Sequence, residues 1–276
     1  MKYNGLIASD FDGTLYLPDN PVSESSLKTF AKLAENKILR VIATGRSLYS
    51  AKKVINSDFP VDYMVLSSGA VLMDWAAKKI IYSHSFEGTL AETAAGLLKE
   101  AELDFMLHRA FPGSHQFYFH HNGNDNADFD RRLSLYSRHA FKLDEMLNIK
   151  QHYSQFVIIL REGQEFPPDI VKSIPALHAV RTTSPLDNKS TWIELYPKNV
   201  SKAAAVRYIQ QMHSIDLNDI WVMGNDYNDL DMLRMTENSF VLESAPEELC
   251  ADFTVLNAST DDALQKLTEI YFGNEG

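Results

Sequence analysis

Short apolar runs and helix patterns alternate along the first third of this chain, and this alternation constrains the fold more than any other feature. The apolar runs span residues 6–9, 38–43 and 63–66. Residues 23–36 lie between the first two runs and have apolar side chains at helical spacing, with Ser23 and Ser26 as the two suitable N-caps. Strands that are separated by helices pair in parallel, with helices on both faces of the sheet. The pattern therefore predicts an α/β fold.

The same alternation returns near the end of the chain, after a middle stretch of different texture. The returning helix patterns span residues 202–212, 230–235 and 261–272, and the strand patterns span residues 220–223 and 240–242. The middle mixes helix patterns with aromatic-rich strands at residues 116–120, 156–160 and 192–196. We therefore predict a core of residues 1–83 and 188–276, which is split by an inserted α+β domain of residues 84–187.

The composition excludes two classes of partner. The chain has 26 Lys and Arg against 37 Asp and Glu, a formal net charge of −11, so we expect no surface for nucleic acid or for an acidic membrane. No apolar run approaches the length of a membrane span, and Asp10 interrupts the N-terminal apolar segment too early for a signal peptide. Cys250 is the only cysteine, so no internal disulfide can form. These features predict a cytoplasmic protein.

Three polar clusters follow predicted strands at the point where each strand ends. They are Asp10-Phe11-Asp12-Gly13-Thr14, Thr44-Gly45-Arg46 and Gly224-Asn225-Asp226-Tyr227-Asn228-Asp229. A fourth cluster, Ser201-Lys202, opens a predicted helix, where a lysine meets the positive end of the helix dipole. Ligands of open parallel sheets bind at the carboxyl ends of the strands. We therefore predict one active-site edge, with an anion beside Lys202.

These residue types suit phosphoryl transfer. A carboxylate such as Asp10 can attack phosphorus and form an aspartyl-phosphate. Repulsion between the carboxylate and an anionic ester calls for a divalent cation, and a few carboxylates and a carbonyl suffice for Mg²⁺. Thr44, the Gly45 amide and Lys202 would cradle the phosphoryl oxygens. Asp12 would give a proton to the leaving oxygen and then take one from the attacking water.

Together the four clusters resemble the motifs of the haloacid dehalogenase superfamily of phosphohydrolases, and within it the Cof-like branch. The matching segments are residues 10–14, residues 43–46 with the arginine typical of this branch, residues 200–203 and residues 224–233. The resemblance implies a Rossmann-like parallel-sheet core with an inserted α/β cap that selects the substrate. It also implies a Mg²⁺-dependent phosphatase that hydrolyses small phosphorylated metabolites, such as sugar phosphates.

The resemblance further implies a role for each matching residue. Asp10 would be the nucleophile, and Asp12 the general acid and base. The phosphate-binding residues would be Thr44, Gly45, Arg46, Lys202 and Asn228. The residues around Mg²⁺ would be Asp10, Asp12 through its backbone carbonyl, Asn225, and Asp229, which would hold a bound water or Lys202.

Two positions depart from the usual pattern of the branch. The fourth motif usually begins Gly-Asp, whereas here Gly224 is followed by Asn225, whose amide oxygen brings less charge to Mg²⁺ than a carboxylate. Asp226 is the alternative third ligand. The branch often has an asparagine after its third strand, where this chain has Ser68. We expect this shorter side chain to lose a contact or to replace it with water.

Two other functions are open at this point. A phosphomutase that resembles the phosphomannomutases would use the same residues but would hold a bisphosphate and turn it round. A non-catalytic metabolite sensor would keep the crevice without turnover. Asn225 and Ser68 favour the sensor, whereas the presence of both Asp10 and Asp12 counts against it, because a sensor needs no nucleophile beside an acid.

Several basic side chains gather in the inserted domain, and their spacing fits no standard zinc site. They are His108, Arg109, His115, His120 and His121. We expect them to lie on a solvated surface. His108, Arg109 and Arg181 are the candidates for contact with the polar part of a substrate.

Overall fold

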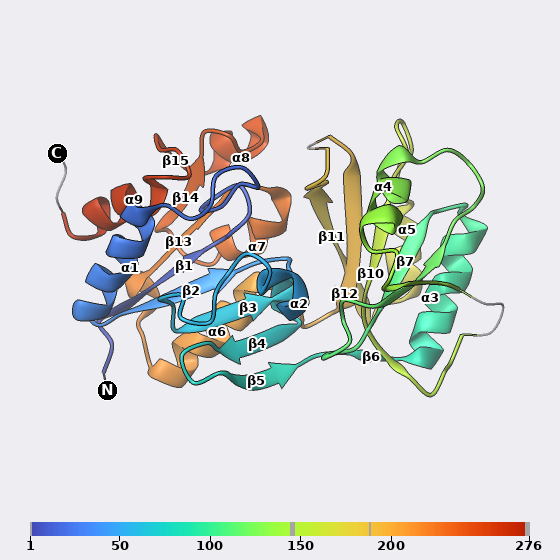
Figure 1. Cartoon of the computed structure of the whole chain (residues 1–276), viewed down its shortest axis with the longest axis horizontal. Coiled ribbons are helices and arrows are strands. Elements are labelled where there is room, and N and C mark those ends of the chain that lie inside the picture. The colour runs from blue at the N-terminus through green and yellow to red at the C-terminus, as the bar shows by residue number, and fades with distance from the viewer. Residues whose placement is uncertain (1, 144–146, 188, 274–276) are drawn as a thin grey trace. The chain divides into compact units, whose positions relative to one another are not determined.

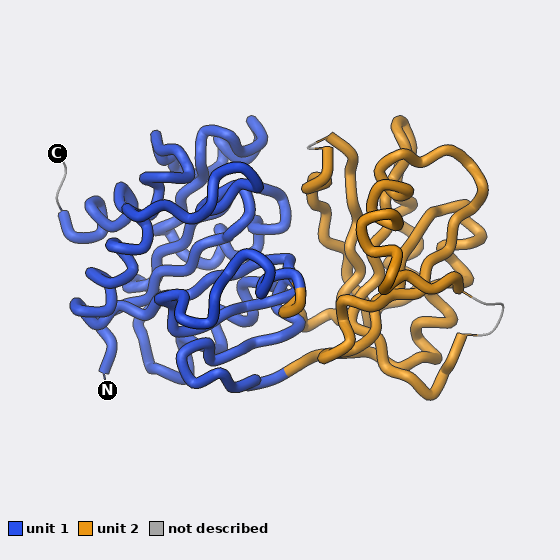
Figure 2. The backbone as a smooth tube through the Cα atoms, in the orientation of Figure 1, with its two compact units in different colours: residues 1–46, 50–82, 201–276 blue, residues 47–49, 83–200 orange. Residues whose placement is uncertain are grey.

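The chain forms two compact units, which Figure 2 shows in different colours. The computed structural model describes residues 2–143, 147–187 and 189–273. Unit 1 comprises residues 1–46, 50–82 and 201–276, and unit 2 comprises residues 47–49 and 83–200. Segments from both ends of the chain therefore share one unit. This arrangement confirms the predicted α/β class, with a core that is interrupted by an insertion.

Unit 1 is built on an eight-stranded sheet (Figure 1). In sheet order its strands are β15 (Thr254–Leu256), β14 (Ser239–Leu242), β13 (Ile220–Gly224), β1 (Gly5–Ser9), β2 (Ile38–Ala43), β3 (Tyr63–Leu66), β4 (Val71–Asp74) and β5 (Lys79–Ser83). The strands from β15 to β3 are parallel, and β4 runs antiparallel to β3. All five residues of the central strand β1 are buried, as expected for a strand covered on both faces.

Helices connect or flank the parallel strands of unit 1 along the chain. They are α1 (Glu24–Glu35), α2 (Leu48–Ala51), α6 (Lys202–His213), α7 (Leu230–Leu233), α8 (Glu247–Asp252) and α9 (Ala263–Tyr271), with single 3₁₀ turns η1 (Ser67–Gly69), η2 (Leu217–Asp219) and η3 (Tyr227–Asp229). The helix α1 begins after Ser23, the first of the two predicted caps, whose hydroxyl accepts a hydrogen bond from the Ser26 amide. Val206 and Ile209 of α6 pack with Leu6 of β1 in one buried cluster.

Unit 2 contains a seven-stranded sheet of mainly antiparallel strands (Figure 1). Its strands are, in sheet order, β11 (Leu177–Thr183), β12 (Thr191–Pro197), β10 (His152–Ile159), β7 (Phe105–Arg109), β8 (Phe117–His120) and β9 (Ala140–Lys142), and β6 (Phe86–Glu87) pairs with β10. Its helices are α3 (Gly88–Glu100), α4 (Ala127–Leu135) and α5 (Pro168–Ser173). The sequence analysis did not predict β6, β7, β9 or β11.

Both faces of the sheet of unit 2 are covered. Phe156 of β10 packs in one buried cluster with residues of α3 and α5. The next residue, Val157, points to the opposite face and packs with Phe129 of α4. Alternation along the strand therefore separates the two cores, as the period of a β-strand requires.

The boundary of unit 2 lies further along the chain than predicted. The sequence placed the return to the core at residue 188, but β12 pairs with β10 and β11 in the sheet of unit 2. The chain enters unit 1 again at Ser201. The pattern of residues 192–196 predicted a strand correctly, but strand pairing depends on distant partners that the pattern does not contain.

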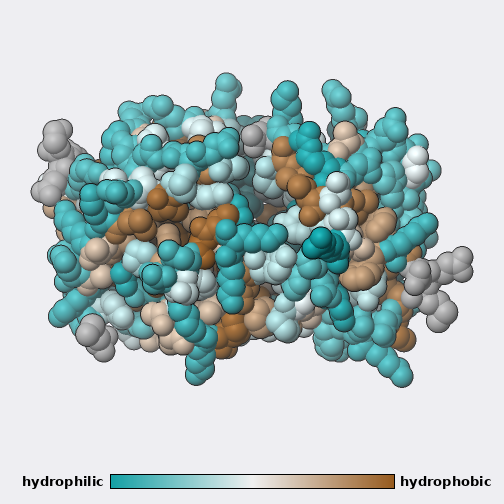
Figure 3. Space-filling model, in the orientation of Figure 1, coloured by the Kyte–Doolittle hydropathy of each residue, from teal (hydrophilic) through white to brown (hydrophobic). Residues whose placement is uncertain are grey.

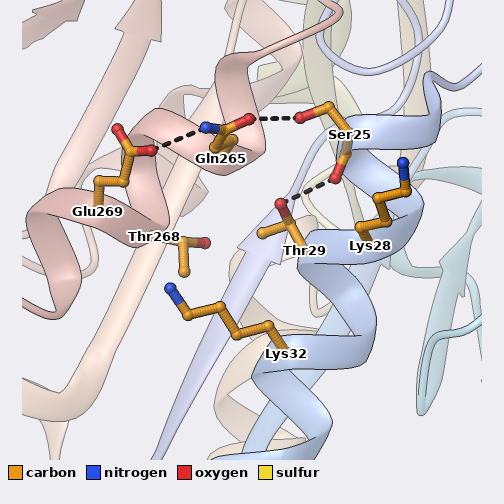
Figure 4. Close-up of a pocket in the computed structure, with 7 residues that line it drawn as sticks. All are labelled: Ser25, Lys28, Thr29, Lys32, Gln265, Thr268 and Glu269. Atoms are coloured by element: carbon orange, nitrogen blue, oxygen red, sulfur yellow. Dashed lines mark hydrogen bonds between the residues drawn. The ribbon is translucent and has the colours of Figure 1, made fainter.

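A groove of about 230 Å³ lies between α1 and α9 of unit 1 (Figure 4). Its lining residues are Ser25, Lys28, Thr29, Lys32, Gln265, Thr268 and Glu269. In this groove the Ser25 hydroxyl donates to the Gln265 side chain at 2.5 Å. Residues of the strand-end clusters do not line it.

The face of the molecule in Figure 3 carries mostly hydrophilic side chains, in keeping with the charged fraction of 23%. The helices of the described residues include none with the length and apolar character needed to cross a lipid bilayer.

Candidate active site

The predicted polar clusters begin at one edge of the sheet of unit 1. In that sheet β1 lies between β13 and β2. Ser9, the last residue of β1, is paired with Met223 on one side and with Ile42 on the other. The three parallel strands therefore end nearly level, and the clusters that follow them are neighbours. This confirms the predicted arrangement of the strands.

Lys202 joins the first and last clusters. Its ammonium donates to Asp10 Oδ1 at 2.7 Å, to Asp229 Oδ1 at 2.5 Å and to Asn228 Oδ1 at 3.2 Å. The lysine side chain is fully buried, and so is that of Asp229. Ser201 caps α6 by accepting a hydrogen bond from the Ala204 amide, so Lys202 is the first helical residue. The two carboxylates offset the unfavourable placement of a cation at this end of a helix.

Burial shifts the protonation equilibria of these groups. Burial, together with the nearby charge of Asp229, raises the pKa of Asp10 to about 8, although the charge of Lys202 opposes both effects. Burial alone would lower the pKa of Lys202, but the charges of Asp10 and Asp229 outweigh it and hold this pKa above its ordinary value. The amine therefore stays a cation beside Asp10.

Asp12 is held by the second cluster. Arg46 Nη2 donates to Asp12 Oδ1 at 2.7 Å, and Arg46 Nε donates to Asp12 Oδ2 at 2.9 Å. Thr44 Oγ1 donates to the same Oδ2 at 3.3 Å. A two-pronged guanidinium contact fixes both the position and the plane of a carboxylate. Arg46, which the sequence placed among the phosphate-binding residues, thus contacts the predicted acid.

Three oxygen-bearing groups converge where the predicted cation would lie. One atom of the Asn225 amide lies 3.3 Å from Asp10 Oδ2 and 3.2 Å from the backbone carbonyl oxygen of Asp12. A carboxylate, a carbonyl and an amide oxygen are donors that suit Mg²⁺. The residues present therefore fit this ion. Of the two candidate third ligands, Asn225 is the one whose side chain lies beside Asp10 Oδ2 and the Asp12 carbonyl oxygen. Within the described ranges, no three His, Cys, Asp or Glu side chains are placed to hold a metal.

Asp229 lies against Lys202 and the loop after β13. Its Oδ1 accepts from Lys202, and its Oδ2 accepts from the backbone amides of Asn225 at 2.9 Å and Asp226 at 3.2 Å. Both oxygens are therefore engaged by the protein. Asp229 orients Lys202 and the loop after β13, in line with the second of the two contacts expected for it.

Ser68 and Gly45 face each other beside this edge. Gly45 is exposed, and a Cβ at this position would lie 3.7 Å from the Ser68 hydroxyl oxygen. Ser68 is buried with a left-handed backbone (φ 52°), and its hydroxyl has no hydrogen-bond partner among the described residues. The expected loss of a substrate or cap contact at this position stays a prediction.

The prediction that the basic side chains of unit 2 lie on a solvated surface is wrong for His108. This side chain is buried, and its Nδ1 lies 2.8 Å from the Ser114 carbonyl oxygen. Burial lowers the pKa of His108 to about 3, with a further lowering by the charge of Arg132. The sequence analysis missed this burial because it did not predict β7, which turns His108 toward the α4 side of the sheet. His115 lies in a ring cluster in which it stacks on Tyr49 with 4.4 Å between ring centroids.

Comparisons with known proteins cover nearly the whole chain. A family model described as haloacid dehalogenase-like hydrolase matches residues 7–266. An HMP-PP phosphatase of Escherichia fergusonii is 25% identical over 254 residues, which cover 90% of this chain and 87% of that protein.

Solved structures have the same fold. A phosphatase of the same superfamily from Bacteroides thetaiotaomicron superposes with a TM-score of 0.77 at 18% identity, covering 99% of this chain and 96% of that one. A subclass IIB sugar phosphatase superposes with a TM-score of 0.74 at 16% identity, covering 98% and 100% of the two chains.

Proposed function

The chain belongs to the haloacid dehalogenase-like hydrolase family, and on that premise we propose that it is a Mg²⁺-dependent phosphatase of small phosphorylated metabolites. The contact between Lys202 and Asp10 carries this proposal. It sets a permanent cation 2.7 Å from the oxygen of a buried carboxylate, although the two residues are far apart in sequence. A phosphoryl group attached to Asp10 would have its new negative charge beside this ammonium.

We assign the chemical steps to Asp10 and Asp12. Asp10 attacks phosphorus, the bond from phosphorus to the ester oxygen breaks, and Asp12 gives its proton to the leaving oxygen. Water then attacks the aspartyl-phosphate, Asp12 takes a proton from this water, and phosphate leaves with Asp10 restored. Arg46 and Thr44 position the Asp12 carboxylate for both proton transfers.

The remaining residues of the edge bind and screen charge. The Gly45 amide, Asn228 and Lys202 are assigned to the phosphoryl oxygens. Mg²⁺ would be held by Asp10 Oδ2, by the carbonyl oxygen of Asp12 and by the amide oxygen of Asn225. When bound there, it reduces the repulsion between the anionic nucleophile and the anionic ester.

We assign the choice of substrate to the inserted part of unit 2, residues 83–200, as a cap. Relatives named as an HMP-PP phosphatase and a sugar phosphatase support a small phosphate ester as the substrate class. In general, a large inserted domain that closes during turnover excludes bulk water and suits a small substrate better than a polymer.

A hydrolysis panel tests the proposal. Phosphorylated sugars, nucleotides and pyrimidine pyrophosphates are incubated with the protein and Mg²⁺, and phosphate release is measured. We expect turnover of at least one class, loss of turnover in Asp10→Asn, and a fall of about 10²–10⁴-fold in Asp12→Ala. Asp19→Asn is the matched control, because it makes the same change at an exposed turn.

Two results would reject the assignment. Unchanged turnover in Asp10→Asn excludes this residue as the nucleophile. Acid quenching during turnover should trap labelled phosphate on the wild-type protein, and trapping on Asp10→Asn to the same extent excludes the proposed intermediate.

A further inference from the structure

The Asn225 amide faces two oxygens that a cation at the strand ends would need. The amide atom on that side lies 3.3 Å from Asp10 Oδ2 and 3.2 Å from the Asp12 carbonyl oxygen, and both of these atoms are acceptors. The other amide atom faces only donors. An amide has a donor end and an acceptor end. Hydrogen bonding alone therefore turns the nitrogen of Asn225 toward Asp10 and Asp12.

The opposite orientation brings three oxygens together with no hydrogen between them. Such an arrangement is repulsive in the protein alone and becomes favourable when a cation lies among the oxygens. The same turn also sets the amide nitrogen against the donors on its other side. The two orientations of Asn225 therefore correspond to two different states of the site.

We propose that Asn225 is an amide plug: in the metal-free protein its nitrogen donates to Asp10 Oδ2 and to the Asp12 carbonyl, and Mg²⁺ binding requires the amide to turn over. This inference rests on the proposed function for the identity of the cation. It predicts a metal site that is stable when empty of metal and that binds Mg²⁺ more weakly than a site with aspartate at position 225.

Gly13 supplies the room that the plug needs. Its backbone is in the left-handed region (φ +79°), and a Cβ at this position would lie 2.2 Å from an amide atom of Asn225. Any side chain at position 13 would therefore collide with the amide and restrict its turning.

The charge of the site also favours a neutral amide at position 225 when no metal is bound. The ion-paired groups here are Asp10, Asp12 and Asp229 against Lys202 and Arg46, and in their ionised forms these five groups sum to a charge of −1. Aspartate in place of Asn225 would make this net charge −2. It would also set a carboxylate against two hydrogen-bond acceptors, Asp10 Oδ2 and the Asp12 carbonyl oxygen. Such a protein is less stable without metal and gains more from Mg²⁺.

Calorimetric titration with Mg²⁺ in the absence of substrate tests the plug. We expect Asn225→Asp to bind Mg²⁺ about tenfold or more tightly than the wild type, because a charged ligand replaces a neutral one. In EDTA the thermal midpoint of Asn225→Asp should be lower than that of the wild type, and Mg²⁺ should raise it by more. Asp226→Asn is the matched control and should bind Mg²⁺ as the wild type does.

Asn225→Ala keeps the test decisive if the aspartate variant does not fold. It lacks both the two hydrogen bonds and the ligand oxygen, so its midpoint in EDTA should fall and its Mg²⁺ affinity should weaken. Equal Mg²⁺ affinity in the wild type and Asn225→Asp overturns the plug, and so does an Asn225→Ala midpoint in EDTA equal to that of the wild type. If the protein meets these binding and stability expectations but hydrolyses nothing in the panel, the proposed role of Asn225 stands and the proposed phosphatase function is rejected. Failure of every variant to bind Mg²⁺ overturns both.

Discussion

Replacing Lys202 with methionine should destabilise unit 1 by about 3–5 kcal/mol at pH 8, since removal of one partner leaves buried charge uncompensated. Methionine has nearly the same length, so the change removes the charge and leaves the packing. The variant loses the contacts with Asp10 at 2.7 Å and with Asp229 at 2.5 Å. Both carboxylates stay buried, with 4% and 0% of their surface exposed.

The loss should depend strongly on pH. The pKa of Asp10 is already raised to about 8 by burial, and it rises further without the opposing effect of Lys202. A carboxyl group whose folded pKa is raised contributes stability below its unfolded pKa and loses it as the pH rises toward the folded value. For each proton that the folded variant binds and its unfolded chain does not, the unfolding free energy therefore falls by about 1.4 kcal/mol per unit rise in pH. Below about pH 8 the wild-type Asp10 is protonated as well, so the two folded proteins differ in bound protons only above that pH, and the destabilisation should shrink between pH 9 and pH 7.

Urea unfolding in EDTA, followed by tryptophan fluorescence, measures the change. Of the three tryptophans, Trp75 and Trp221 lie in unit 1, so a Trp192→Phe background reports on that unit. Lys28→Met is the control, because the exposed pair of Lys28 and Glu24 should contribute no more than about 0.5 kcal/mol. A loss below about 1 kcal/mol for Lys202→Met at pH 8, or an equal loss at pH 9 and pH 7, would refute the reasoning.

Three further changes test other parts of the structure. Gly69→Ala should cost roughly 2–4 kcal/mol in urea unfolding and should reduce turnover, because its Cβ would lie 2.2 Å from the carbonyl oxygen of Ser201 at a φ of +105°; a neutral effect would contradict this. Arg46→Lys should lower kcat by about tenfold or more, since lysine cannot form the two-pronged contact with Asp12, and an unchanged kcat would exclude this positioning role. Burial lowers the pKa of His108 to about 3, so the neutral ring contributes stability above its unfolded pKa of about 6.5, and this is lost as the pH falls toward 3. His108→Phe should flatten the fall in the thermal midpoint between pH 6.5 and pH 4, and a slope equal to that of the wild type would contradict the burial.

The elements that the sequence predicted well are those that depend on local pattern. The strand at residues 38–43 and the start of α1 after Ser23 follow from apolar spacing and from capping, which involve neighbours in the chain. The position of Asp10 and Thr44 at strand ends follows in the same way. A parallel sheet then places the ends of adjacent strands side by side, so local pattern was sufficient to predict that these residues share one edge of the sheet.

The amino-acid sequence by itself thus determined the α/β class and the residue types at the strand ends. Only the tertiary structure decided which polar groups meet: that Lys202 contacts both Asp10 and Asp229, that Arg46 contacts Asp12 through two nitrogens, and that the Asn225 amide faces Asp10. It also decided that β12 belongs to unit 2. Each of these facts depends on groups that are distant in the chain and on the orientation of a side chain, and neither is encoded in the spacing of neighbouring residues.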